Sequence, residues 1–273
     1  MSNFWQRVIT GFFFTATIIG AIWFGPTSFR LLFLLTALLS LREYYHLIGA
    51  DARKPQKKAG LFAGAFLYVS IAFSADLFDY IARPEVLVMP AIALVFFAEL
   101  YRKQSDPFGN IAHTVIGILY TVLPFALLCN TSMQHGTYDA TILLGYFLLV
   151  WSSDSFAYVF GNLMGKTRLF ERISPKKSWE GSIGGGLSTL GIAYILSIYF
   201  PAYSLMDWLI IALLVVVTGT LGDLSESMLK RSLNVKDSGN ILPGHGGMLD
   251  RFDAVLLSIP FVWAYLVLFH QHH

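Results

Sequence analysis

The sequence of 273 residues is 55% hydrophobic and only 13% charged, whereas soluble domains carry about a quarter charged residues. This composition excludes an ordinary soluble enzyme and indicates a membrane protein. The net charge of +2 is too small to favour nucleic acid as a partner, and the single cysteine, Cys129, excludes an internal disulfide and a thiolate metal cluster.

Nine stretches of the sequence are candidate membrane spans, since a spanning helix needs about 20 predominantly apolar residues. In chain order they are residues 8–25, 29–48, 59–75, 85–101, 111–130, 141–161, 183–201, 207–222 and 254–270. Arg7 precedes the first as in a signal peptide, but no small-x-small cleavage site follows, so we expect a retained helix. The third, fourth and eighth stretches are short, so the prediction is about nine spans.

The positions of Lys and Arg give an independent test, because these residues accumulate in cytoplasmic loops. With nine spans and a cytoplasmic N-terminus, seventeen of the nineteen Lys and Arg residues fall on the cytoplasmic side, and only Arg30 and Arg83 do not. The same arrangement places both long polar segments, 162–182 and 223–253, on the cytoplasmic face.

No polar stretch is much longer than about thirty residues, so no soluble domain fits anywhere in the chain. We therefore predict an all-α, polytopic integral membrane helix bundle that forms a single membrane domain, residues 1–273. Residues 1–140 are expected to serve mainly as anchor and packing. Residues 141–273 are expected to hold the catalytic helices and the two cytoplasmic loops.

The sixth predicted span contains the sequence DSFAYVFG, which places Asp154 and Tyr158 on one helix face. An ionisable group within a membrane is costly and usually faces a polar cavity, so both residues are candidate site residues. The alternative for Asp154 is a structural hydrogen bond to a neighbouring helix. The sequence GNLMGKT at 161–167 looks like a P-loop, the glycine-rich loop that binds nucleotide phosphates. It has three residues between its glycines where a P-loop has four, and it follows a predicted membrane helix instead of a strand, so we reject this interpretation.

The first long loop carries the sequence RISPKKSWEGS. Three residues of this loop are of types that bind phosphate, namely the hydroxyl residue Ser174 and the cations Lys176 and Lys177. Glu180 is near enough in sequence to pair with Lys176. A cytoplasmic loop that is merely positively charged would explain the two lysines, but not the proline, tryptophan and glutamate among them. The glycines that follow, within 180–191, indicate close packing between helices.

The second long loop begins with GDLSESMLKRSL. If this stretch is helical, Asp223, Ser227 and Lys230 share one face, although a solvated helix beside the membrane is the alternative. Asp250 and Asp253, at the start of the ninth span, also share a face and repel each other unless a cation lies near. Hard oxygen ligands without a thiol favour Mg²⁺, which shares its shell with substrate phosphates. The alternative for this aspartate pair is a helix start favoured by the helix dipole.

Between these carboxylates lie further cations and the glycines of PGHGG, whose backbone N–H groups can turn toward an anion. The remaining candidates in this stretch are Arg231, Lys236, Asp237, His245, Gly246 and Arg251. His245 is open to three roles, namely phosphate contact, proton relay or a hydrogen bond within the loop. The combination predicts a metal and polyphosphate site.

The whole stretch 227–253, SMLKRSLNVKDSGNILPGHGGMLDRFD, resembles the signature of the phosphatidate cytidylyltransferases, also called CDP-diacylglycerol synthases. The GD at 222–223, the SPKKSWEG at 174–181 and the DSFAYVFG at 154–161 also look like elements of that family. These motifs cover the C-terminal half of the chain, whereas the N-terminal half offers hydropathy and little else.

The resemblance implies a multi-pass membrane enzyme, usually a homodimer, that joins CTP and phosphatidate to give CDP-diacylglycerol and pyrophosphate. It implies Asp223 and Asp250 as ligands of Mg²⁺, with Asp253 in the same group of acidic residues, and it leaves a second cation open. The site would face the cytoplasm, at the inner membrane if the source is prokaryotic, where phosphatidate in the bilayer meets CTP.

For the mechanism we expect in-line attack of the lipid phosphate on the α-phosphorus of CTP. Lys230, Arg231, Lys236 and Arg251 would hold the phosphates, and Lys176 and Lys177 would close the site. Two alternative functions remain at this point. One is a transporter of a phosphorylated solute, and the other is a CTP-dependent lipid kinase, which would release CDP.

Overall fold

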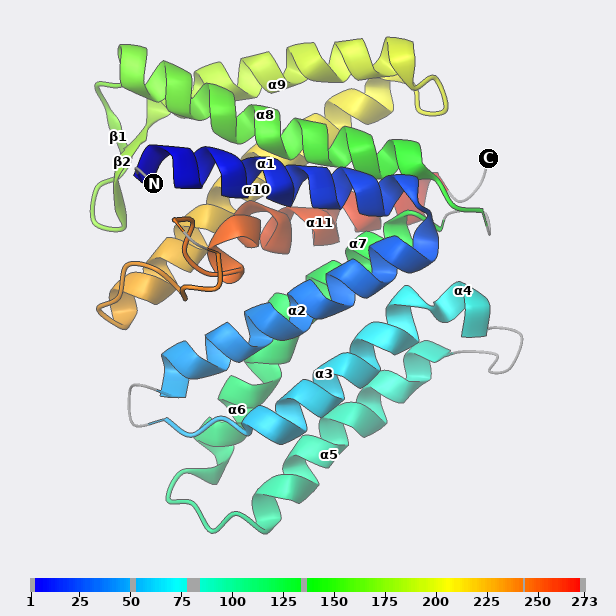
Figure 1. Ribbon diagram of the computed structural model, residues 1–273, viewed down its shortest axis with the longest axis vertical. Helices are drawn as coiled ribbons and strands as arrows, with labels where there is room; N and C mark the ends of the chain where they lie inside the picture. Colours follow the sequence, from blue (N-terminus) through cyan, green and yellow to red (C-terminus); the bar gives the residue numbers. More distant parts are fainter. Residues whose placement is uncertain (1–2, 50–52, 78–83, 134–136, 243, 271–273) are drawn as a thin grey trace. The chain divides into compact units, whose positions relative to one another are not determined.

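A computed structural model describes residues 3–49, 53–77, 84–133, 137–242 and 244–270. The chain forms two compact units. The first unit comprises Met1–Tyr138 and Asp237–Phe252, and the second comprises Asp139–Lys236 and Asp253–His273. Nearly all regular structure in both units is α-helical (Figure 1), which confirms the predicted all-α membrane fold.

Among the described residues, seven helices are long and apolar enough to cross a membrane. They are α1 (Asn3–Trp23), α2 (Pro26–Gly49), the helix Pro107–Thr131, α8 (Ala140–Met164), α9 (Trp179–Tyr199), α10 (Leu205–Ser232) and α11 (Leu249–Phe269). The nine predicted spans include all seven of these helices. The third and fourth predicted spans are instead the shorter helices α3 (Lys57–Ala72) and α5 (Val88–Leu100).

Each of these two helices is shorter than the predicted span because part of the apolar run belongs to another element. The run of the third predicted span is interrupted at Phe73, where α3 ends and the short helix α4 (Ser74–Leu77) begins. The run of the fourth opens with the 3₁₀ turn Pro84–Leu87. At 1.5 Å per residue, α3 is about 24 Å long and α5 about 20 Å, less than the hydrocarbon thickness of about 30 Å.

The first unit places α3 between α2 and α5 (Figure 1). The long helix behind them consists of α6 (Pro107–Gly117), a π-helical turn (Ile118–Val122) and α7 (Leu123–Thr131). Pro124 lies just after the π turn, and a proline has no backbone N–H to give to the helix ladder. The wider turn lets the helix continue through the proline as one span.

Aromatic rings form the core of the first unit. The centroids of Phe33 and Phe125 lie 5.6 Å apart, and those of Phe125 and Phe252 lie 5.1 Å apart. Nearby, the hydroxyl of Tyr68 donates to the backbone oxygen of Arg30 at 2.7 Å and lies 3.0 Å from the sulfur of Cys129, which is fully buried. Cys129 is thus a core residue, as its apolar sequence context suggests.

The second unit packs α8 and α9 side by side along their length (Figure 1), with α10 against α9. A Cβ at Gly185 would lie 2.9 Å from Ala157 of α8, and one at Gly181 would lie 2.8 Å from the backbone oxygen of the same alanine. The predicted packing role of this glycine-rich stretch is confirmed. Between the two helices a small antiparallel hairpin, β1 (Arg168–Phe170) and β2 (Ser174–Ser178), replaces the loop that the sequence suggested.

Gly145 of α8 gives a test of this packing. The indole ring of the fully buried Trp208 occupies the space that a side chain at Gly145 would need. We expect Gly145→Ala to destabilise the protein by about 1–3 kcal/mol through overpacking, seen as a lower thermal midpoint in detergent. Gly191→Ala, on α9 with no atom within 4 Å of the added Cβ, should not lower that midpoint; equal midpoints for the two variants would contradict the packing argument.

Candidate functional site

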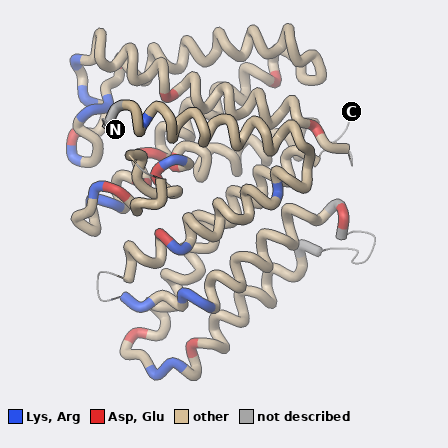
Figure 2. The backbone as a smooth tube through the Cα atoms, viewed as in Figure 1, with Lys and Arg blue, Asp and Glu red and all other residues tan. Residues whose placement is uncertain are grey.

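Charged residues lie mostly at helix ends and in the connecting loops, and the middles of the long helices carry few of them (Figure 2). In the second unit an ion pair joins Lys177 of β2 to Asp223 of α10. Both side chains are partly buried, with 26% and 29% of their surfaces exposed. The hydroxyl of Ser227 donates to the Oδ1 of Asp223 at 3.3 Å, which confirms that α10 continues past the membrane span and places these residues on one face.

Asp253 of α11 lies within electrostatic range of Asp154, Asp223 and Lys177. The close approach of α10 and α11 depends on Gly222, because a Cβ there would lie 2.6 Å from the backbone oxygen of Asp253. Three helices of the second unit therefore bring one carboxylate each to a single region. We call Asp154, Asp223 and Asp253 the acidic cluster, and Lys177 is the cation that faces it.

The acidic cluster fits Mg²⁺ by its chemistry. Over the described ranges no three or more His, Cys, Asp and Glu residues are arranged as a complete metal-binding group. Mg²⁺, however, is usually held by only one or two carboxylates and completes its shell with water and substrate phosphates. Asp223 and Asp253 supply hard oxygen donors of that kind, and Asp223 is paired with Lys177.

Glu180, at the start of α9, has a different partner from the one its sequence position suggested. Its carboxylate accepts the backbone N–H groups of Lys166 and Thr167, each at 3.1 Å, rather than the side chain of Lys176. It thereby fastens the end of α8 to the start of α9. Of the predicted phosphate-binding residues in this loop, Lys177 reaches the acidic cluster, whereas Lys176 is exposed and Ser174 lies at the start of β2.

Four other predicted residues of the second unit lie on α8, on α10 or just after α10. Lys230 forms an ion pair with the fully buried Glu226 at 2.5 Å, one turn earlier on α10. Arg231, Lys236 and Tyr158 are exposed.

In the first unit, the described residues of the segment before α11, 237–242 and 244–248, form a turn-rich loop that we call the glycine loop. Gly244 and Gly246 have φ angles of +75° and +83°, in the left-handed region that favours glycine, which explains two glycines of PGHGG. The backbone N–H of His245 donates to the oxygen of Leu242 at 2.9 Å, and its imidazole lies beside Gly11 of α1. Asp237 and, just beyond the loop, Arg251 are exposed.

Asp250 holds the glycine loop from the first turn of α11. Its Oδ2 accepts the N–H of Ser238 at 2.8 Å, the hydroxyl of Ser238 at 2.9 Å and the N–H of Gly247 at 2.8 Å. Only 7% of Asp250 is exposed. These bonds are those of a buried carboxylate that organises a loop, a role that differs from both sequence-based interpretations of this residue, the metal ligand and the helix start favoured by the dipole.

Sequence analysis missed Glu43, which holds the same loop from α2. Its Oε1 accepts the N–H of Met248 at 2.9 Å, and its Oε2 accepts the N–H of Leu249 at 2.8 Å and the hydroxyl of Ser238 at 3.3 Å. The residue is 6% exposed. One signal could have identified it, namely an ionisable side chain inside a predicted membrane span.

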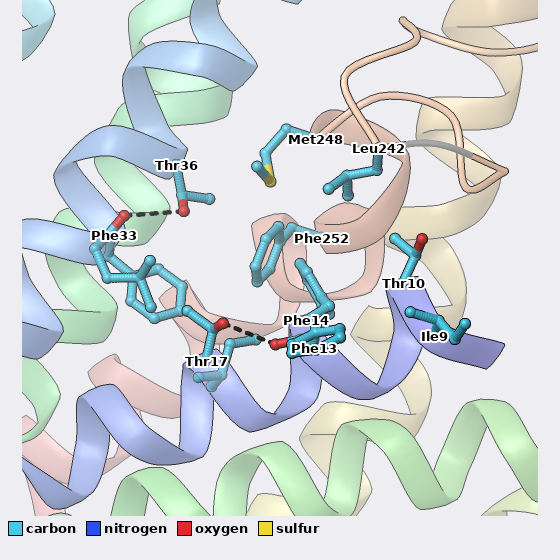
Figure 3. A pocket seen from close by; sticks show the side chains of 12 residues that line it. Ile9, Thr10, Phe13, Phe14, Thr17, Phe33, Thr36, Leu242, Met248 and Phe252 are labelled. Carbon is cyan, nitrogen blue, oxygen red and sulfur yellow. Dashed lines mark hydrogen bonds between the residues drawn. The ribbon is translucent and has the colours of Figure 1, made fainter. Parts of the chain in front are cut away.

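A pocket of about 370 Å³ lies in the first unit beside the glycine loop (Figure 3). Side chains of α1 and α2 line it together with Leu242 and Met248 of the loop and Phe252. Of its polar members, Thr17 and Thr36 donate their hydroxyl protons to backbone oxygens of their own helices. The lining therefore suits hydrocarbon better than a triphosphate.

Comparison with known proteins agrees with the motifs. The sequence matches the cytidylyltransferase family over residues 5–269. A phosphatidate cytidylyltransferase of Staphylococcus haemolyticus is 33% identical over 93% of this chain and 95% of its own length. Proteins of the same name from Bacillus subtilis, 32% identical over 97% and 98%, and from Haemophilus influenzae, 31% identical over 94% and 96%, are also similar.

Proposed function

The chain belongs to the cytidylyltransferase family, and on that premise we propose that it is the enzyme that converts CTP and phosphatidate into CDP-diacylglycerol and pyrophosphate. The similarity to phosphatidate cytidylyltransferases extends over nearly the whole length of both chains. The observation that supports the proposal best within the molecule is the acidic cluster with Lys177, where carboxylates and a cation are available to a metal and to phosphates.

The reaction requires little covalent chemistry of the protein. An oxygen of the phosphatidate phosphate forms a bond to the α-phosphorus of CTP, while the bond from that phosphorus to the oxygen bridging to the β-phosphorus breaks, and pyrophosphate leaves. The nucleophile is already anionic, because the second pKa of a phosphate monoester is about 6. A strong general base is therefore unnecessary, so His245 is not needed to remove a proton, and catalysis depends on positioning and charge neutralisation.

We assign these tasks to individual residues. Lys177 would contact a phosphate when the substrate competes with Asp223 for it, and Lys230, Arg231, Lys236 and Arg251 remain candidates for phosphate binding. Asp223 and Asp253 would hold Mg²⁺, with Asp250 a third candidate from its sequence position, and a second cation stays open. Bound Mg²⁺ would supply charge neutralisation at the triphosphate and the departing pyrophosphate.

The membrane setting follows from the lipid substrate. The seven long apolar helices among the described residues make the chain a multi-pass membrane protein, which keeps it where phosphatidate has its acyl chains. The apolar pocket beside the glycine loop is suited to part of such a chain. We further propose that the site faces the cytoplasm of a prokaryotic inner membrane, as the loop charges predict, and that the enzyme works as a homodimer.

Pyrophosphate release by the purified protein in detergent, with CTP, Mg²⁺ and phosphatidate, tests the function. We expect release only when all three are present, with radiolabelled cytidine appearing in the lipid phase, and loss of activity after chelation of the metal. Release of CDP would instead identify a lipid kinase, and an unchanged solute moved across vesicles would identify a transporter. Family membership favours neither of these alternatives.

A further inference from the structure

The glycine loop of the first unit is held by two buried carboxylates that are far apart in the sequence. Asp250 binds the loop locally, across three residues to Gly247 and twelve to Ser238. Glu43 reaches it from α2, more than two hundred positions earlier than Met248 and Leu249. We propose that Glu43 is a positioning residue for the cytidylyl transfer, because it fixes the shape of the loop and the start of α11. This inference rests on the proposed function.

The bonds of Glu43 explain why a carboxylate is required. The N–H groups of Met248 and Leu249 lie where α11 begins, and the N–H groups at a helix start have no partner within the helix. Glu43 accepts both of them, one on each oxygen, and its negative charge is favourable beside the positive end of the helix dipole. The third donor, Ser238, also donates to Asp250, so the two carboxylates share one loop residue.

The glycines of the loop give a second, independent observation. A Cβ at Gly239 would lie 2.6 Å from the Oε1 of Glu43, and one at Gly247 would lie 2.5 Å from its Oε2. Neither residue has a left-handed backbone, so turn geometry does not require glycine at these two positions. The Glu43 carboxylate takes up the space of a side chain at Gly239, and at Gly247 it does so together with the hydroxyl oxygen of Ser238, which would lie still closer to the added Cβ. Glu43 and these glycines therefore form one packing arrangement.

The substitution Glu43→Gln tests the proposal. The amide keeps one accepting oxygen but turns an NH₂ toward a backbone N–H, so at least one donor of the loop loses its partner. We expect turnover of CTP and phosphatidate to fall on the order of 30-fold, as small misplacements of positioned groups do. We also expect amide hydrogen exchange at Met248 and Leu249 to become faster, while the thermal midpoint shows that the protein is folded.

Glu99→Gln is the matched control. Glu99 lies in the same unit, is 5% exposed, and accepts the side chains of Asn110 at 2.9 Å and Arg102 at 2.7 Å, away from the glycine loop. We expect this variant to keep the turnover of the folded wild type and the slow exchange of Met248 and Leu249.

Three results would overturn the proposal. One is turnover of folded Glu43→Gln within threefold of wild type, another is an equal loss in Glu99→Gln, and the third is unchanged amide exchange at Met248 and Leu249. A wild-type protein without any cytidylyl transfer would refute the proposed function instead. The exchange comparison would then still decide whether Glu43 fixes the loop, because it needs no substrate.

Discussion

Asp223→Asn is expected to lower cytidylyl transfer by at least two orders of magnitude, about 2.7 kcal/mol in the activation barrier, while the protein stays folded. The amide keeps the shape of the side chain and an acceptor for the hydroxyl of Ser227, but it removes the charge that pairs with Lys177 and that would bind Mg²⁺. The measurement is initial-rate pyrophosphate release at saturating CTP, compared across Mg²⁺ concentrations.

The control for this substitution lies on the same helix. Asp207, in the first turn of α10, accepts the N–H of Ser204 at 2.9 Å and the hydroxyl of Tyr265 at 2.6 Å, so it has a structural role at the opposite end. Asp207→Asn should cost stability but leave the turnover of the folded fraction unchanged. Near-normal turnover in purified Asp223→Asn would remove Asp223 from the site and with it the proposed metal ligand.

Asp253→Asn should have the second large effect, a loss of about 100-fold in the same assay, equivalent to about 2.7 kcal/mol. Asp253 lies in electrostatic range of both other members of the acidic cluster, so a cation bound there would act on its carboxylate and on that of Asp223 together. If both aspartates act on one cation, the double variant loses less than the product of the two single losses, because groups that act as a unit are not additive.

Ser258→Ala separates this effect from disturbance of α11. Ser258 is fully buried on the same helix and forms a hydrogen bond of 2.6 Å with the hydroxyl of Tyr146 of α8. Removing it should cost about 1 kcal/mol of stability without changing turnover. Independent, multiplying losses for Asp223→Asn and Asp253→Asn would argue against a shared cation, even if both single variants were inactive.

The long helices could be predicted from the sequence because a long apolar stretch is by itself enough to identify a membrane span. The two segments that became α3 and α5 could not, because their apolar runs are interrupted by helix breaks at Phe73 and before Val88 that hydropathy does not detect. The site was predicted only by residue type. The two lysines of SPKKSWEG look alike in the sequence, but successive side chains of a strand point to opposite sides, and on β2 it is Lys177 that reaches Asp223.

Asp250 and Glu43 show a further limit of sequence patterns. The spacing of Asp250 and Asp253 correctly puts both near the start of one helix, but the donors that bind Asp250 come from the path of the loop, which no local rule specifies. Glu43 belongs to no motif, and its partners are about two hundred residues away. Only its charge within an apolar run distinguishes it.

The burial of Cys129 between helices of the first unit gives the protein a built-in chemical reporter. It is the only thiol in the chain, and in the folded state it is covered completely and lies against the hydroxyl of Tyr68. A maleimide should therefore leave the native protein unlabelled and modify it only as these helices open. The rate of labelling therefore ranks the variants above by how readily these helices open in detergent. A cysteine introduced at the surface would be the one accessible thiol of the folded protein and thus a single site for a fluorophore.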